Sequence, residues 1–175
     1  HDDGSSEVGW QNGSGNYTAV RFNASAGGED VVRAKWFQIG NGGAFYLYLW
    51  EDNNGLPGTE IDHWIITSGI NGWNDFDLST EGIVISGDFW LGVREFSSSN
   101  PFGLDTDSDS GNTYFRIGAG GAWEALSSIG ISGNLMLRVY LDSGELTTCV
   151  LGDVNMDSNI DVLDIVYLIN IILGP

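Results

Sequence analysis

Residues 44–52 read AFYLYLWED, and their strict alternation between two side-chain classes decides the fold. Successive side chains of an extended strand point to opposite faces, so one face carries Phe45, Leu47 and Leu49. The opposite face carries three aromatic residues, Tyr46, Tyr48 and Trp50. An aliphatic face on such a strand is the natural core of a β-sandwich, and this stretch predicts one.

Residues 88–96, DFWLGVREF, repeat this alternation, because Phe89, Leu91 and Val93 oppose Trp90 and Arg94. Similar stretches extend from residue 10 to about residue 142, separated by clusters of Gly, Asn, Asp and Ser. The 26 glycines and only 3 prolines agree with a turn-rich β architecture. We therefore predict a mainly β fold, a jelly-roll-like antiparallel β-sandwich. Its strands lie near Tyr17–Asn23, Val31–Ile39, Phe45–Glu51, Ile61–Thr67, Trp73–Leu78, Gly82–Ile85, Phe89–Phe96, Thr113–Ile117 and Leu135–Asp142.

The aromatic face of residues 46, 48 and 50 points away from this core and requires a cover. Three covers are open: the core or loops of the same domain, another subunit, and sugar rings stacked on the aromatic groups. We expect them in that order.

The chain is strongly acidic, with 6 Lys and Arg against 24 Asp and Glu and a formal net charge of -18. Such a surface repels phosphate backbones and anionic lipids, so nucleic acid is not an expected partner. Carboxylates crowded into loops instead favour divalent cations.

A calcium loop is predicted near the C-terminus, where the sequence reads DVNMDSNIDVLD from residue 153. Oxygen-bearing side chains occupy the first, third, fifth, ninth and twelfth places, and the seventh place would donate a backbone carbonyl. This is the ligand spacing of a twelve-residue EF-hand-type loop for Ca²⁺. The predicted ligands are Asp153, Asn155, Asp157, Asn159, Asp161 and Asp164.

The segment GDVNMDSNIDVLDIVYLINIILG resembles one repeat of a dockerin, a calcium-dependent docking module of secreted bacterial enzymes and surface proteins. Dockerins carry two such repeats, whereas this chain has one, and Ser158 stands where the loop usually has Gly. The resemblance implies that the loop and its helix dock on a cohesin-like receptor or a similar partner.

The residues after the loop predict a short helix that is apolar on all sides and therefore buried on all sides. The sandwich can cover one side, and a second chain or a receptor can cover the other. The residues expected to contact that partner are Ile165, Leu168, Ile169, Ile172 and Leu173.

These patterns divide the chain into three parts: a sandwich over 1–142, a short linker over 143–152, and the calcium loop with its helix over 153–175. The sandwich is similar to β-sandwich modules near the C-termini of exported bacterial proteins, through DDGSSEVGW, NNGLPGTEI, GWNDFDLS and SGDFWLGVR. That similarity implies an accessory, non-catalytic role.

Export through a cleaved signal peptide is expected, because the chain starts at His1 and three N-glycosylation acceptors cluster at Asn12, Asn16 and Asn23. No stretch is long enough to span a bilayer. The single Cys149 is either a buried small side chain or the site of an intermolecular disulfide.

The remaining sequence patterns give weaker evidence for a functional site. Asp105, Asp107 and Asp109 alternate as a calcium loop would begin, but Arg116 stands at the twelfth place, so a solvated acidic loop is expected. No nucleophile elbow or His-based zinc motif is present, and an enzyme is not predicted.

The predicted function is that of a non-catalytic extracellular assembly protein, a filament-type subunit whose calcium-loaded tail docks on the next copy. The alternative is a carbohydrate-binding or cohesin-docking accessory module of a secreted bacterial protein.

Overall fold

The computed structural model describes residues 2–96, 101–144 and 162–173. The chain divides into two compact units, His1–Ser143 and Gly144–Pro175, and each is described by itself. The first unit is mainly β and antiparallel, consistent with a β-sandwich, and the helix of the second is α1, Val162–Leu173. No helix within the described ranges is long and apolar enough to cross a membrane.

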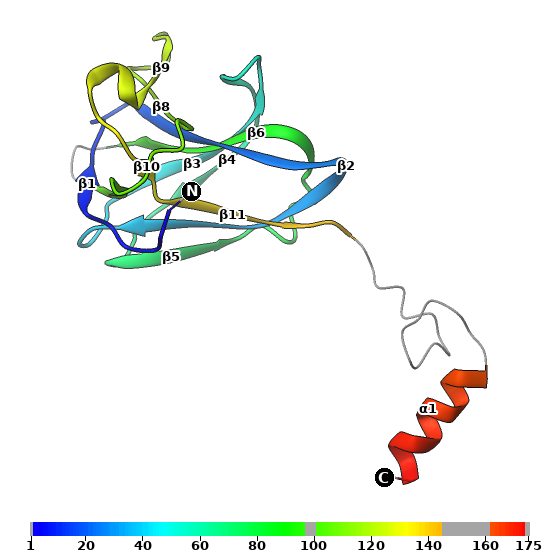
Figure 1. Cartoon of the computed structure of the whole chain (residues 1–175). Coiled ribbons are helices and arrows are strands. Elements are labelled where there is room, and N and C mark those ends of the chain that lie inside the picture. The colour runs from blue at the N-terminus through cyan, green and yellow to red at the C-terminus, as the bar shows by residue number, and fades with distance from the viewer. Residues whose placement is uncertain (1, 97–100, 145–161, 174–175) are drawn as a thin grey trace. The chain divides into compact units, whose positions relative to one another are not determined.

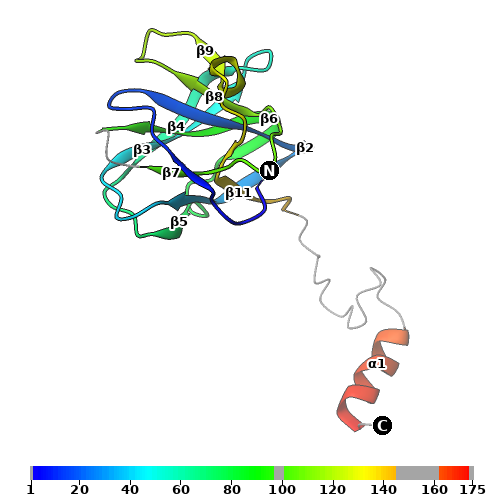
Figure 2. The ribbon, with the colours of Figure 1, turned by 60° about the vertical axis from the view of Figure 1, so that its left-hand side comes forward.

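The described residues of the first unit form eleven strands and one short 3₁₀ helix, Leu126–Ile129. Figures 1 and 2 show their arrangement. The strands are β1 (Val8–Trp10), β2 (Tyr17–Gln38), β3 (Phe45–Asp52), β4 (Pro57–Ile66), β5 (Gly72–Asp77), β6 (Val84–Glu95), β7 (Phe102–Asp105), β8 (Thr113–Arg116), β9 (Trp123–Ala125), β10 (Asn134–Leu135) and β11 (Leu137–Asp142).

Strand β2 connects the two layers of the fold. Its first half pairs with β6 on one side and β8 on the other, and its second half pairs with β5 and β11. Figure 1 shows the blue ribbon crossing the molecule, turning near its label and returning below. The turn is a bulge between Ala24 and Glu29, where Gly28 adopts a φ of 88° that favours glycine.

The prediction of two separate strands over Tyr17–Asn23 and Val31–Ile39 was therefore wrong. The intervening ASAGGED reads as a turn, yet it bends one continuous strand. The predicted strands Gly82–Ile85 and Phe89–Phe96 likewise merge into β6, and three short strands, β1, β7 and β9, were not predicted.

The main core confirms the alternation seen in residues 44–52 and 88–96. The aliphatic-face side chains are at most 1% exposed: Phe45, Leu47, Leu49, Phe89, Leu91 and Val93. They pack with Val20 from the first half of β2 and with Val31 and Trp36 from its second half. The core therefore lies between the two layers.

Candidate functional site

The aromatic face of β3 is covered, because Tyr48 is 8% exposed and Trp50 only 4%. These rings form a second cluster with Tyr17 and Trp90, and Trp123 of β9 packs against it. These side chains point away from the main core, as predicted, and are buried in this second cluster. The cover comes from the same domain, the first of the three expected covers, and Trp50 offers no open surface for a sugar ring.

Curling of one layer produces this burial. Strands pair in the order β3, β6, β2, β8 and β9, so β3 and β9 would lie ~19 Å apart in a flat sheet with strands ~4.8 Å apart. The ring centroids of Trp50 and Trp123 are nevertheless 5.6 Å apart. The sheet therefore curls over its own aromatic face and buries most of it.

One row of paired residues crosses this curled layer and alternates rings with guanidinium groups. Tyr46 pairs with Arg94, Arg94 with Tyr17, Tyr17 with Arg116, and Arg116 with Trp123. The Arg116 guanidinium lies 4.1 Å from the Tyr17 ring centroid and 4.8 Å from that of Trp123. The Arg94 guanidinium lies 5.5 Å from Tyr17 and 5.8 Å from Tyr46. We call these five residues the aromatic–arginine row.

The charges of the row have no counter-charge within the described ranges. Three of the six Lys and Arg residues form ion pairs elsewhere: Arg33 and Lys35 with Asp75, and Arg138 with Asp2. Neither Arg94 nor Arg116 has such a pair there, and the Nε atom of each is buried without an acceptor in the part of the chain that is described. Arg21 also has no ion pair there, but its guanidinium donates to the side-chain oxygen of Asn112 at 3.2 Å and lies 6.0 Å from the Trp90 ring centroid.

Glu95 lies next to Arg94 in sequence but on the opposite, core-facing side of β6. It is 1% exposed and its Oε1 accepts the backbone N–H of Asn12 at 2.7 Å. Burial raises the pKa of the Glu95 carboxyl, although hydrogen bonds from the backbone of Asn12 and Gly13 act in the other direction. Glu95 therefore does not neutralise the row.

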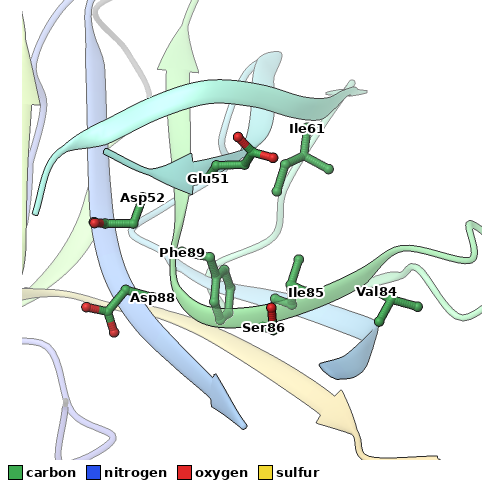
Figure 3. A pocket seen from close by; sticks show the side chains of 8 residues that line it. All are labelled: Glu51, Asp52, Ile61, Val84, Ile85, Ser86, Asp88 and Phe89. Carbon is green, nitrogen blue, oxygen red and sulfur yellow. The ribbon is translucent and has the colours of Figure 1, made fainter. Parts of the chain in front are cut away.

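A groove of about 340 Å³ lies at another part of the sandwich, between the end of β3 and the start of β6 (Figure 3). Ile61 and Val84 line it together with three carboxylates, Glu51, Asp52 and Asp88. Two of these already have partners: Asp52 accepts the indole N–H of Trp90 at 2.8 Å, and Asp88 accepts the amide of Asn23 at 2.7 Å. Asp52 and Asp88 therefore stabilise the fold through these hydrogen bonds.

The predicted solvated loop at residues 105–109 is only partly solvated. Asp107 and Asp109 are exposed, but Asp105 is fully buried. Its oxygens accept the backbone N–H groups of Asp3 and Asp107 at 3.1 and 3.0 Å. Asp105 thus holds the N-terminal segment through Asp3. In the described ranges no three His, Cys, Asp or Glu side chains gather as a metal site would require.

Of the three predicted glycosylation acceptors, Asn23 is exposed, whereas Asn12 and Asn16 are half-buried. The Asn12 amide donates to the backbone carbonyl of Tyr17 at 2.7 Å, and the Asn16 side chain accepts the N–H of Gly118 at 2.9 Å. Asn23 is therefore the most exposed of the three acceptors, and its amide donates to Asp88 at 2.7 Å.

In the second unit, six of the apolar side chains of α1 are between 43% and 70% exposed: Val162, Leu163, Ile165, Val166, Leu168 and Ile172. Three of them, Ile165, Leu168 and Ile172, belong to the predicted contact set. The side chains of Ile169 and Leu173 lie outside the described ones. The predicted calcium ligands Asp153, Asn155, Asp157, Asn159 and Asp161, the side chain of Asp164, and Cys149 lie outside them too.

Comparison with protein-family models and with curated proteins finds no match. Among solved structures, the fold is similar to one containing the cysteine protease and lectin-like domains of Cwp84, a surface layer associated protein of Clostridium difficile. The TM-score is 0.58 at 13% identity, over 74% of this chain and 32% of that one. A clostridial Cwp84 cysteine protease after propeptide cleavage matches with a TM-score of 0.56 and 14% identity, over 76% of this chain and 37% of that one.

The chain thus spans about a third of the length of these proteins. At this identity the likeness concerns the fold alone. It agrees with the mainly β architecture of the first unit.

Proposed function

We propose that this chain is a non-catalytic extracellular assembly subunit whose C-terminal loop and helix dock on a neighbouring copy. The observation that carries the proposal is the apolar composition of α1, together with the lack of a cover for it in the described part of its own unit, where Ile165 and Ile172 are 59% and 70% exposed. Contiguous apolar surface of this kind marks an interaction site on a soluble protein.

The composition of α1 defines the chemistry of its partner. Its sequence, VLDIVYLINIIL, holds one charged residue in twelve. A helix of this length is marginal in water by itself and depends on packing for its stability. The receiving surface is therefore an apolar groove that accepts the helix by burial, with no need of a matching charge.

Calcium has two roles in this proposal. The spacing of oxygen side chains from Asp153 to Asp164 suits one ion, whose binding orders the loop and the start of the helix. The ion also lowers the negative charge of a subunit that carries a formal -18, and so reduces the repulsion between packed copies.

Three features support an exported protein: the clustered acceptors at residues 12, 16 and 23, the dockerin-like spacing, and a fold similar to that of a surface-layer-associated protein. Each is compatible with a role at the cell surface. A cohesin-like receptor is the alternative partner for the helix.

The proposal is tested by light scattering of the full chain with calcium and with chelator. Calcium should produce large particles, and chelator, Asp153→Ala or Ile172→Asp should return the chain to monomer. The matched control is Ile70→Asp, which changes a side chain of the first unit that is 68% exposed and should leave assembly intact. A chain that stays monomeric at all concentrations with calcium bound contradicts self-assembly and leaves docking on a separate receptor.

A further inference from the structure

The geometry points to the aromatic–arginine row as a binding site for a carboxylate-bearing glycan, held by the guanidinium groups of Arg94 and Arg116. Nothing in this inference depends on the C-terminal helix, because every residue of the row lies in the first unit.

Carboxylate recognition follows from how the two cations are held. An arginine fixed by a carboxylate of its own chain has its N–H donors occupied, whereas an arginine held against a ring keeps them available. Arg116 lies between Tyr17 and Trp123, at 4.1 and 4.8 Å from their centroids. The face of a ring attracts a cation, so the ring holds the side chain in place without consuming its N–H donors. The planar fork of guanidinium donors matches a carboxylate in two-point contact.

The unpaired state of these arginines is the second observation. The chain has four times as many acidic residues as basic ones. Of the other arginines, Arg33 and Arg138 have carboxylate partners, and Arg21 donates to the side-chain oxygen of Asn112 at 3.2 Å. In the described ranges no carboxylate of the chain reaches Arg94 or Arg116, and both have a buried Nε without an acceptor. The row therefore holds positive charge that an external anion can neutralise.

The rings of the row select a glycan over other carboxylates. Tyr46 and Trp123 stand at its two ends and are half-buried, so part of each ring remains open. The edge of Tyr46 is extended by Phe96, which is 40% exposed and 4.6 Å from it between centroids. A sugar acid offers both a carboxylate for the fork and an apolar C–H face for a ring, whereas an acidic peptide offers mainly the charge.

The test uses the full chain and pairs of glycans that differ only in charge. The probes are oligogalacturonate, hyaluronan fragments and sialyllactose, each measured by calorimetry beside its neutral counterpart, the methyl ester or the desialylated sugar. A poly-glutamate peptide of equal charge is the third arm. We expect saturable binding of at least one acidic glycan and more than tenfold weaker binding of its neutral counterpart.

Arg116→Gln and Arg94→Gln should each weaken that binding at least tenfold, and Arg116→Lys should do so as well, because it keeps the charge but loses the fork. The control is Arg33→Gln, an exposed arginine of β2 that pairs with Asp75 and should bind as the parent chain does. Near-ultraviolet circular dichroism establishes that each variant keeps its aromatic packing.

Three results would overturn the inference. The first is an absence of binding to all acidic glycans, which needs no variant to interpret. The second is equal binding by Arg116→Gln with the fold intact. The third is equal affinity for poly-glutamate, which would show a peptide or charge-only site.

Discussion

Gly92 lies on β6 between Trp90 and Arg94, on the side of the strand that faces the aromatic cluster. A Cβ at this position would lie 2.5 Å from the carbonyl oxygen of Thr18 and 2.8 Å from both Cα and Cβ of Ala19. These are atoms of β2, the neighbouring strand, and no rotation of a flexible side chain can move them away. Gly92→Ala must therefore separate β6 from β2.

The free energy of unfolding should fall by about 2–4 kcal/mol in this variant. Overpacking a dense site by one methyl group costs about 1–3 kcal/mol. Separation of the strands weakens at least one ladder hydrogen bond next to Gly92, and each contributes about 1 kcal/mol. With a urea dependence of about 2 kcal/mol per molar for a small domain, the midpoint should move down by ~1–2 M.

Urea unfolding followed by tryptophan fluorescence measures this shift. The matched control is Gly120→Ala, because Gly120 has no heavy atom within 4 Å of the added Cβ and no positive φ. The control should lose no stability. A midpoint for Gly92→Ala within experimental error of the control would refute the close approach of β6 and β2, and with it the geometry of the aromatic–arginine row.

Three further substitutions probe buried polar groups, each by urea unfolding. Asp52→Ala removes the acceptor of the fully buried Trp90 indole N–H and should cost about 1–3 kcal/mol, whereas an unchanged midpoint would contradict that hydrogen bond. Glu95→Gln should change the pH profile, because burial raises the pKa of Glu95 and its ionisation destabilises the folded state. The stability tied to protonated Glu95 is present below the ordinary glutamate pKa of about 4.3 and is lost as pH rises through the raised pKa. Over that window the variant should therefore gain stability relative to the parent chain. Parallel pH profiles of the two proteins would contradict the raised pKa. Asp105→Ala should lower the free energy of unfolding by about 2–4 kcal/mol, because the buried oxygens of Asp105 accept two backbone N–H groups and a serine hydroxyl. A loss under about 0.5 kcal/mol would show that these hydrogen bonds do not stabilise the fold.

The strand faces were predictable because side-chain alternation is a local property. Phe45, Leu47 and Leu49 had to share a face in any strand, and the aliphatic face of a sandwich strand is buried in any register. The continuity of β2 was not predictable in this way. Residues 25–28 are small, as in a turn, and the pairing of β2 with β6 both before and after them keeps them within one strand.

The site was less accessible from sequence. Tyr46, Tyr48 and Trp50 indicated an aromatic surface, but Arg116 and Trp123 lie about seventy residues away and join it through pairing of β8 with β2. Register between distant strands is set by the whole packing arrangement, which no local pattern contains. The burial of Asp105 was missed for a similar reason. Its alternation with two exposed acids suggested solvent exposure, and one of the backbone N–H groups that it accepts, that of Asp3, lies about a hundred residues away in the sequence.

Net charge and local charge act over different distances at the aromatic–arginine row. At a distance an anionic ligand meets a chain of formal charge -18, so the long-range field opposes its approach until salt screens it over about 8 Å. Within contact distance the ligand meets Arg94 and Arg116, which have no counter-charge in the described ranges and are flanked by rings that exclude water. Attraction there is stronger per contact than in bulk solvent, because the local dielectric constant is lower. The acidic surface thus rejects anions in general, and the row admits those that fit its fork and its rings.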